Sequence, residues 1–148
     1  RIGPRGVYSS LCRHSLYSAG CGVDIADYIE TVNVSAIRAA DREIDIEAPF
    51  NIPGGYYQAG ILRVSATSDP IPVLRQGLSS NDPPYLTTLR LTRWSEELTD
   101  EPSTVQVAPG CDFSSDTCAA RFSNLVNFGG FDSLTAIDRS PFFDGWNR

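Results

Sequence analysis

The stretch Glu43-Ile44-Asp45-Ile46-Glu47-Ala48 decides the fold of this chain, because apolar and charged residues alternate along it without a break. Successive side chains of a β-strand point to opposite faces, so Ile44 and Ile46 share one face. This period of two predicts a half-buried antiparallel strand. Pro49 interrupts the pattern, since proline has no N–H to donate to a strand ladder.

Further segments with strand character lie on both sides of this stretch. Turn-forming clusters at residues 68–70, 81–84 and 100–103 separate them, because Pro presets φ and Asn or Asp can bond its own backbone. The predicted strands span residues 31–37, 43–48, 57–66, 71–78, 85–94 and 104–108. Short strands at regular spacing predict a mainly β fold, an antiparallel barrel or sandwich, rather than alternating strands and helices.

Helix signals are confined to the flanks of this β-rich region. Residues 24–30 predict one short turn with Asp24 as its cap. Residues 118–127 predict a second helix, which Asp116 or Thr117 would cap and Gly129-Gly130 would end. Its apolar stripe at helical spacing consists of Ala119, Phe122, Leu125 and Val126.

The length of 148 residues suits a single domain with its own core. We divide it into a first cysteine element (1–30), a β-rich insert (31–108), and a second cysteine element with a C-terminal tail (109–148). Since methionine is absent even at position 1, we expect a processed product or part of a longer protein.

The composition argues against several classes of protein. An apolar fraction of 41% with 20% charged residues is typical of a globular domain. No apolar run approaches the roughly 20 residues of a membrane-spanning helix, and residues 1–5 show no signal-peptide core. The net charge of -6, with its 12 basic residues scattered, argues against binding to nucleic acid.

Four cysteines carry the strongest chemical signal. Cys12 and Cys21 form a C-x8-C pair, Cys111 and Cys118 form a C-x6-C pair, and 89 residues separate the pairs. Two disulfides, a four-cysteine zinc site and an iron-sulfur cluster are the competing interpretations. Disulfides need an oxidising compartment, which nothing in the sequence indicates, and zinc usually takes shorter C-x2-4-C spacings. A 4Fe-4S cube is larger and takes one thiolate at each corner, which favours a cluster.

Outside the four cysteines, the sequence gives only weak signals for metal binding or catalysis. His14, the only histidine, lies two residues after Cys12 and is either a hydrogen-bond partner of a cluster sulfur or merely exposed. The chain has no G-x-S-x-G motif, so we predict no catalytic residues and no enzyme activity.

Two runs of sequence resemble the signature that ends a family of phage tail hub proteins, which also includes proteins of gene transfer agents. The first runs from Leu11 to Tyr17 and from Gly20 to Asp24. The second reads PGCD at 109–112, TCAARFSN at 117–124 and NFGGF at 127–131. Ser123 stands where the family usually has glycine. The cysteine arrangement is also similar to that of the minor tail protein L of lambda-like phages, whose C-terminal domain holds an iron-sulfur cluster through four cysteines.

The resemblance implies that a cluster of the 4Fe-4S type joins the ends of the chain as a structural clasp, with Cys12, Cys21, Cys111 and Cys118 as its ligands. It implies a structural virion protein of the tail tip or baseplate hub, assembled in the bacterial host cytoplasm. The implied partners are distal tail, hub, central fibre or tape-measure proteins, with the chain as a homotrimer or small ring. The alternative is a secreted β-rich binding domain stabilised by disulfides.

Overall fold

The computed structural model describes residues 9–79 and 83–130, and they form two compact units. One unit consists of residues 24–112. The other combines the described residues up to Val23 with those from Phe113 onward. Within these ranges no helix has the length and apolar character needed to cross a membrane.

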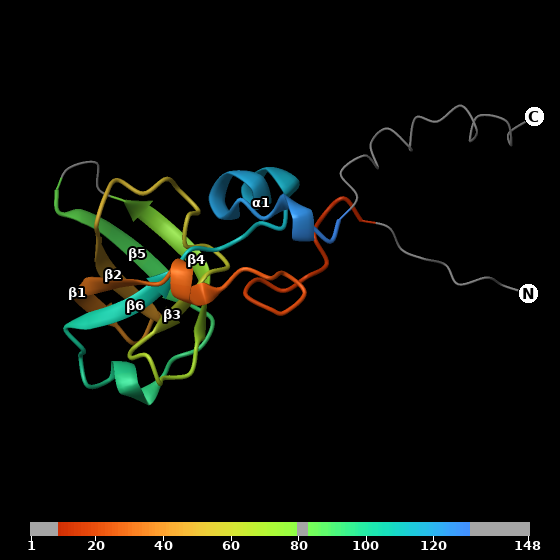
Figure 1. Cartoon of the computed structure of the whole chain (residues 1–148). Coiled ribbons are helices and arrows are strands. Elements are labelled where there is room, and N and C mark those ends of the chain that lie inside the picture. The colour runs from red at the N-terminus through yellow and green to blue at the C-terminus, as the bar shows by residue number, and fades with distance from the viewer. Residues whose placement is uncertain (1–8, 80–82, 131–148) are drawn as a thin grey trace, which may run out of the picture. The chain divides into compact units, whose positions relative to one another are not determined.

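The unit of residues 24–112 is a closed antiparallel barrel of six strands (Figure 1). The neighbours run in the order β1-β2-β5-β4-β3-β6, and β6 pairs with β1 to close the barrel. The strands are β1 (Glu30–Arg38), β2 (Glu43–Ala48), β3 (Ile61–Arg63), β4 (Ile71–Ser79), β5 (Tyr85–Leu91) and β6 (Thr104–Ala108). The predicted mainly β fold is therefore confirmed, and of the two predicted architectures it is the barrel.

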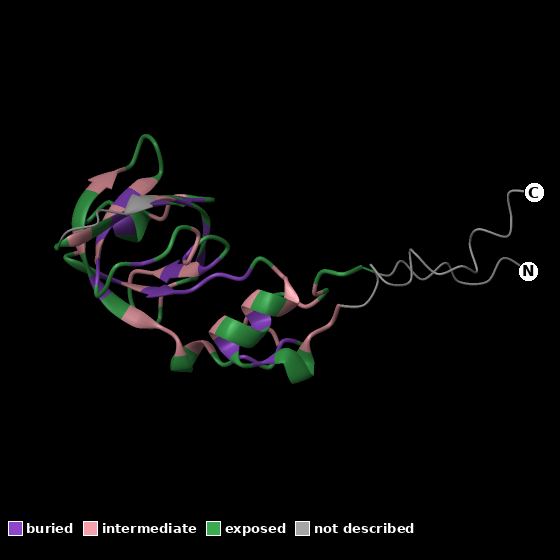
Figure 2. Ribbon diagram, turned by 90° about the horizontal axis from the view of Figure 1, so that it is seen from above, coloured by how far each residue is buried: buried purple, intermediate pink, exposed green. Residues whose placement is uncertain are grey.

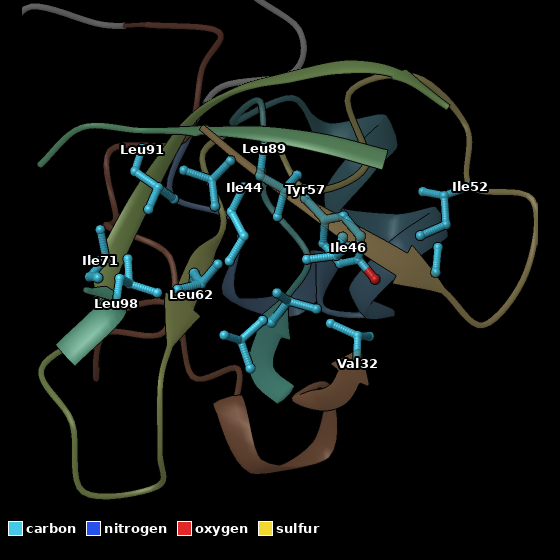
Figure 3. Packing of buried hydrophobic residues seen from close by; sticks show 14 residues of the cluster. Val32, Ile44, Ile46, Ile52, Tyr57, Leu62, Ile71, Leu89, Leu91 and Leu98 are labelled. Atoms are coloured by element: carbon cyan, nitrogen blue, oxygen red, sulfur yellow. The ribbon is translucent and has the colours of Figure 1, made fainter. Parts of the chain in front are cut away.

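Alternating burial explains why these segments form strands. In β2, Ile44 and Ile46 are completely buried, while the residues between them lie on the outer wall. Figure 3 shows their side chains pointing into the interior with those of the other strands, and Figure 2 shows buried, intermediate and exposed residues along the barrel ribbon. Burying one such aliphatic side chain contributes roughly 1.5–3 kcal/mol. The core also includes Val32, Leu62, Ile71, Val73, Leu89, Leu91, Leu98, Val105 and Val107.

The predicted strand at 57–66 is wrong over most of its length, since only Ile61–Arg63 forms β3. The preceding residues form turns, and the backbone N–H of Tyr57 donates to the side-chain oxygen of Gln76 at 2.8 Å instead of to a strand. The Gln76 amide in turn donates to the carbonyl of Pro53 at 3.2 Å. Both side chains are buried, so this pair satisfies polar groups that would otherwise lose solvation without compensation.

The helices agree in part with the sequence prediction. A 3-10 turn, η1, spans Ile25–Asp27, and the Asp24 carboxylate accepts from the Ala26 N–H at 2.9 Å, as predicted. Another, η2, spans Glu96–Leu98 and buries Leu98 in the barrel core.

The predicted helix at 118–127 is displaced toward the N-terminus. Helix α1 spans Ser115–Phe122, and Ser114 caps it by accepting from the Thr117 N–H at 3.1 Å, so neither Asp116 nor Thr117 is the cap. It ends at Ser123, which adopts the left-handed conformation with φ 48°, before the glycines are reached.

A separate 3-10 turn, η3, follows at Leu125–Asn127. Leu125 and Val126 are 51% and 89% exposed and do not continue an apolar stripe.

An ion-pair network lies on the outer wall of the barrel. The Arg38 guanidinium donates to both carboxylate oxygens of Asp45, at 2.6 and 2.8 Å, and to Glu43 at 3.3 Å. The Thr88 hydroxyl donates to Asp45 at 2.6 Å. These bonds stabilise the ionised carboxylate and hold the pKa of Asp45 below its usual range, against the effect of its partial burial.

We expect Asp45→Asn to lower the melting temperature by about 2–4 °C at neutral pH. The pKa of Asp45 is lower in the folded protein than in the unfolded chain, where it is about 3.9. The stability that this difference contributes is present above about pH 3.9 and is lost as the pH falls through the pKa of the folded protein. The difference from wild type should therefore be smaller at about pH 3 than at neutral pH. Calorimetry at both pH values checks this, with Asp41→Asn on the exposed β1–β2 turn as the control. An equal difference at both pH values would contradict it.

Candidate functional site

The unit outside the barrel joins segments from both ends of the described chain. The backbone N–H of Cys12 donates to the carbonyl of Phe113 at 2.8 Å, and Phe113 follows Cys111 by two residues. Gly22, with φ +72°, leaves room for the side chain of Asn127, because an added Cβ would lie 2.9 Å from its nitrogen. Residues of the first cysteine element and residues from Phe113 onward therefore pack together within this unit.

Cys12 is half-buried, and its sulfur accepts a hydrogen bond from the backbone N–H of Gly129 at 3.3 Å. Such N–H groups aimed at sulfur stabilise a thiolate, the form in which cysteine binds metals. A pocket of about 300 Å³ opens beside this sulfur. It is lined by Leu11, Cys12, Arg13, His14, Ser15 and Phe113.

The His14 ring lies between two glycines that come from opposite ends of the described chain. A Cβ on Gly20 would lie 2.6 Å from Nδ1, and a Cβ on Gly129 would lie 2.5 Å from Cδ2. His14 is thus half-buried and neither merely exposed nor seen bonded to a sulfur within the described residues. Its role here is to pack the two elements against each other.

Cys21 and Cys118 are buried and connected through one residue, Asn124. The Asn124 amide nitrogen donates to the Cys21 carbonyl at 2.5 Å and lies 3.9 Å from the Cys21 sulfur. The Cys118 thiol donates to the Asn124 carbonyl at 3.3 Å. These contacts join the loop at Cys21 to the end of helix α1.

Cys111 lies in the barrel unit, directly after β6, and is buried. Gly110 before it donates to the Tyr56 carbonyl at 2.8 Å. A Cβ on Gly110 would lie only 1.6 Å from the Gln58 carbonyl oxygen, so this close backbone approach requires glycine.

The predicted convergence of all four cysteines on one formed metal site is not seen. Among residues 9–79 and 83–130, no group of three or more His, Cys, Asp or Glu side chains is arranged to hold a metal ion. None of the four cysteines is in a disulfide, and four thiolates would suit an iron-sulfur cluster as a donor set.

Asn124 and the backbone N–H of Gly129 were not among the predicted site residues. Both lie within the sequence motifs that carry the family resemblance, at residues 117–124 and 127–131. Phe131, the last residue of those runs, lies outside the described residues.

These features define a class of small β-barrel proteins with a cysteine-bearing unit built from the segments flanking the barrel. The model of the family described as phage conserved hypothetical protein BR0599 matches residues 55–138, more than half of the chain, and the chain belongs to this family. No curated protein matched the chain.

Among solved structures, the chain is similar to one in the "Virion of native gene transfer agent (GTA) particle". The TM-score is 0.62 at 19% identity over 90% of this chain, which shows a shared fold. The match covers 47% of that chain, so this chain spans about half of its length.

We expect Gly129→Ala to destabilise the cysteine-bearing unit by about 1–3 kcal/mol, because its Cβ would overlap a His14 ring that Gly20 holds from the other side. The alkylation rate of Cys12 should rise as its loop loosens. Gly54→Ala, whose Cβ would meet nothing within 4 Å, is the matched control. Unchanged stability and unchanged alkylation of Cys12 in Gly129→Ala would argue against the overlap.

Proposed function

We propose that this chain is a structural virion protein of the phage tail tip or baseplate hub, and that Cys12, Cys21, Cys111 and Cys118 together hold an iron-sulfur cluster of the 4Fe-4S type. Membership of a phage family and the fold shared with a chain of a gene transfer agent virion support the virion role. The proposed location is the tail tip of a particle assembled in the host cytoplasm.

The observation that carries the cluster proposal is the backbone hydrogen bond from Cys12 to Phe113. Consecutive Cα atoms are about 3.8 Å apart, so Cys111 lies within two residues' reach of a segment that already bonds Cys12. The hydrogen bonds to the sulfurs of Cys12 and Cys21 add the donors that a sulfur-ligated site needs.

When bound, the cluster would supply binding energy that counts as folding energy, because the unfolded chain lacks the site. We propose that the chain uses it as a clasp between the two cysteine elements and not for catalysis. Within the described ranges, the neighbouring Leu125 and Val126 expose apolar surface on η3, which suits contact with a partner in an assembly. Distal tail, hub, central fibre or tape-measure proteins and further copies in a trimer or small ring are the proposed partners.

Protein purified without air should be brown and contain about four irons and four sulfides per chain. Iron and acid-labile sulfide analysis checks this, together with zinc analysis of the same sample. A colourless preparation whose electrophoretic mobility changes on reduction would instead favour the secreted, disulfide-stabilised binding domain.

Cys118→Ser should abolish the brown colour, lower the melting temperature and yield few functional particles, because one lost ligand leaves the clasp open. Ala119→Ser, which introduces the same side chain at the exposed neighbouring position of α1, is the control and should behave as wild type. Normal tails of unchanged stability with failure only of DNA delivery would contradict the clasp and favour a redox or triggering role.

A further inference from the structure

The end of helix α1 places Asn124 beside Cys118. Ser123 takes the left-handed conformation that commonly ends helices, and it turns the chain so that the Asn124 N–H donates to the Cys118 carbonyl at 3.1 Å. The Asn124 carbonyl accepts from the Cys118 thiol. The backbone of Asn124 is therefore set by the residue whose sulfur it faces.

The side chain of Asn124 is oriented by a second amide. Asn127 donates to the Asn124 side-chain oxygen at 2.7 Å, which leaves the Asn124 amide nitrogen directed at the Cys21 carbonyl. Because a carbonyl only accepts, the nitrogen and not the oxygen must face Cys21. Asn124 is 9% exposed, so its amide competes little with water for these partners.

We propose that Asn124 is a positioning residue that sets the placement of the Cys21 loop relative to Cys118. That these two cysteines are ligands of a cluster rests on the proposed function. The hydrogen bonds by which Asn124 holds the Cys21 loop do not depend on it. Aspartate has the same shape as asparagine but would place an acceptor against the Cys21 carbonyl. If Asn124 acts by donating a hydrogen bond, Asn124→Asp should therefore be as defective as Asn124→Ala.

Hydrogen exchange of the full-length protein tests the positioning without iron. The Gly22 N–H, which donates to the Ser18 carbonyl at 2.9 Å, should exchange about tenfold faster in Asn124→Ala and Asn124→Asp, as expected for the loss of one buried hydrogen bond. Asn127→Ala, which frees the orientation of the Asn124 amide, should give a smaller change in the same direction. Asn33→Ala, on the exposed face of β1, is the matched control.

Iron loading gives the second readout. After anaerobic reconstitution, the two Asn124 variants should lose their brown absorbance to a chelator several-fold faster than wild type, while exchange in β2 stays unchanged. Unchanged Gly22 exchange in both variants would overturn the proposal even if wild type binds iron. If wild type binds no iron but the Gly22 N–H exchanges faster in the variants, the proposed cluster is refuted and the positioning role of Asn124 is retained.

Discussion

The pairing of β1 with β6 is the constraint on which the barrel depends. Glu30 lies opposite Val107 and Val32 opposite Val105, although more than 70 residues separate them in sequence. This ladder satisfies the backbone groups of both strands and leaves neither as an exposed edge along the paired segment. It also encloses the apolar faces of all six strands in one interior, where Ile44, Leu62 and Leu89 are completely removed from water.

Most of the strands could be predicted because one face of each is buried, so that apolar and polar residues alternate along its sequence. Residues 43–48 form β2 as predicted. The segment before Ile61 was not predictable in this way, because the Tyr57 N–H donates to the side chain of Gln76, and a partner so distant in sequence leaves no local pattern. The start of helix α1 was also mispredicted, because several adjacent residues can cap a helix and the local sequence does not single out Ser114.

That the four cysteines are ligands of one cluster stays a prediction. The structure brings Cys12, Cys21 and Cys118 into one unit. The hydrogen-bond roles of the sulfurs could not be read from sequence, because they depend on backbone N–H groups such as that of Gly129 and on a carbonyl of Asn124. Ser123 is instructive, since its positive φ gives a physical reason for the glycine that the resembling family usually carries there.

The strand register at Glu30 and Val107 also bears on how such a chain can diversify. The chain enters the barrel through β1 and leaves it through the adjacent, antiparallel β6, so entry and exit lie about 5 Å apart between paired Cα atoms. A segment with neighbouring ends is a modular insertion, which a short hairpin or an unrelated module with the same end spacing could replace. What the flanking segments require of the barrel is then the spacing of its two ends, and not the path of the chain between them.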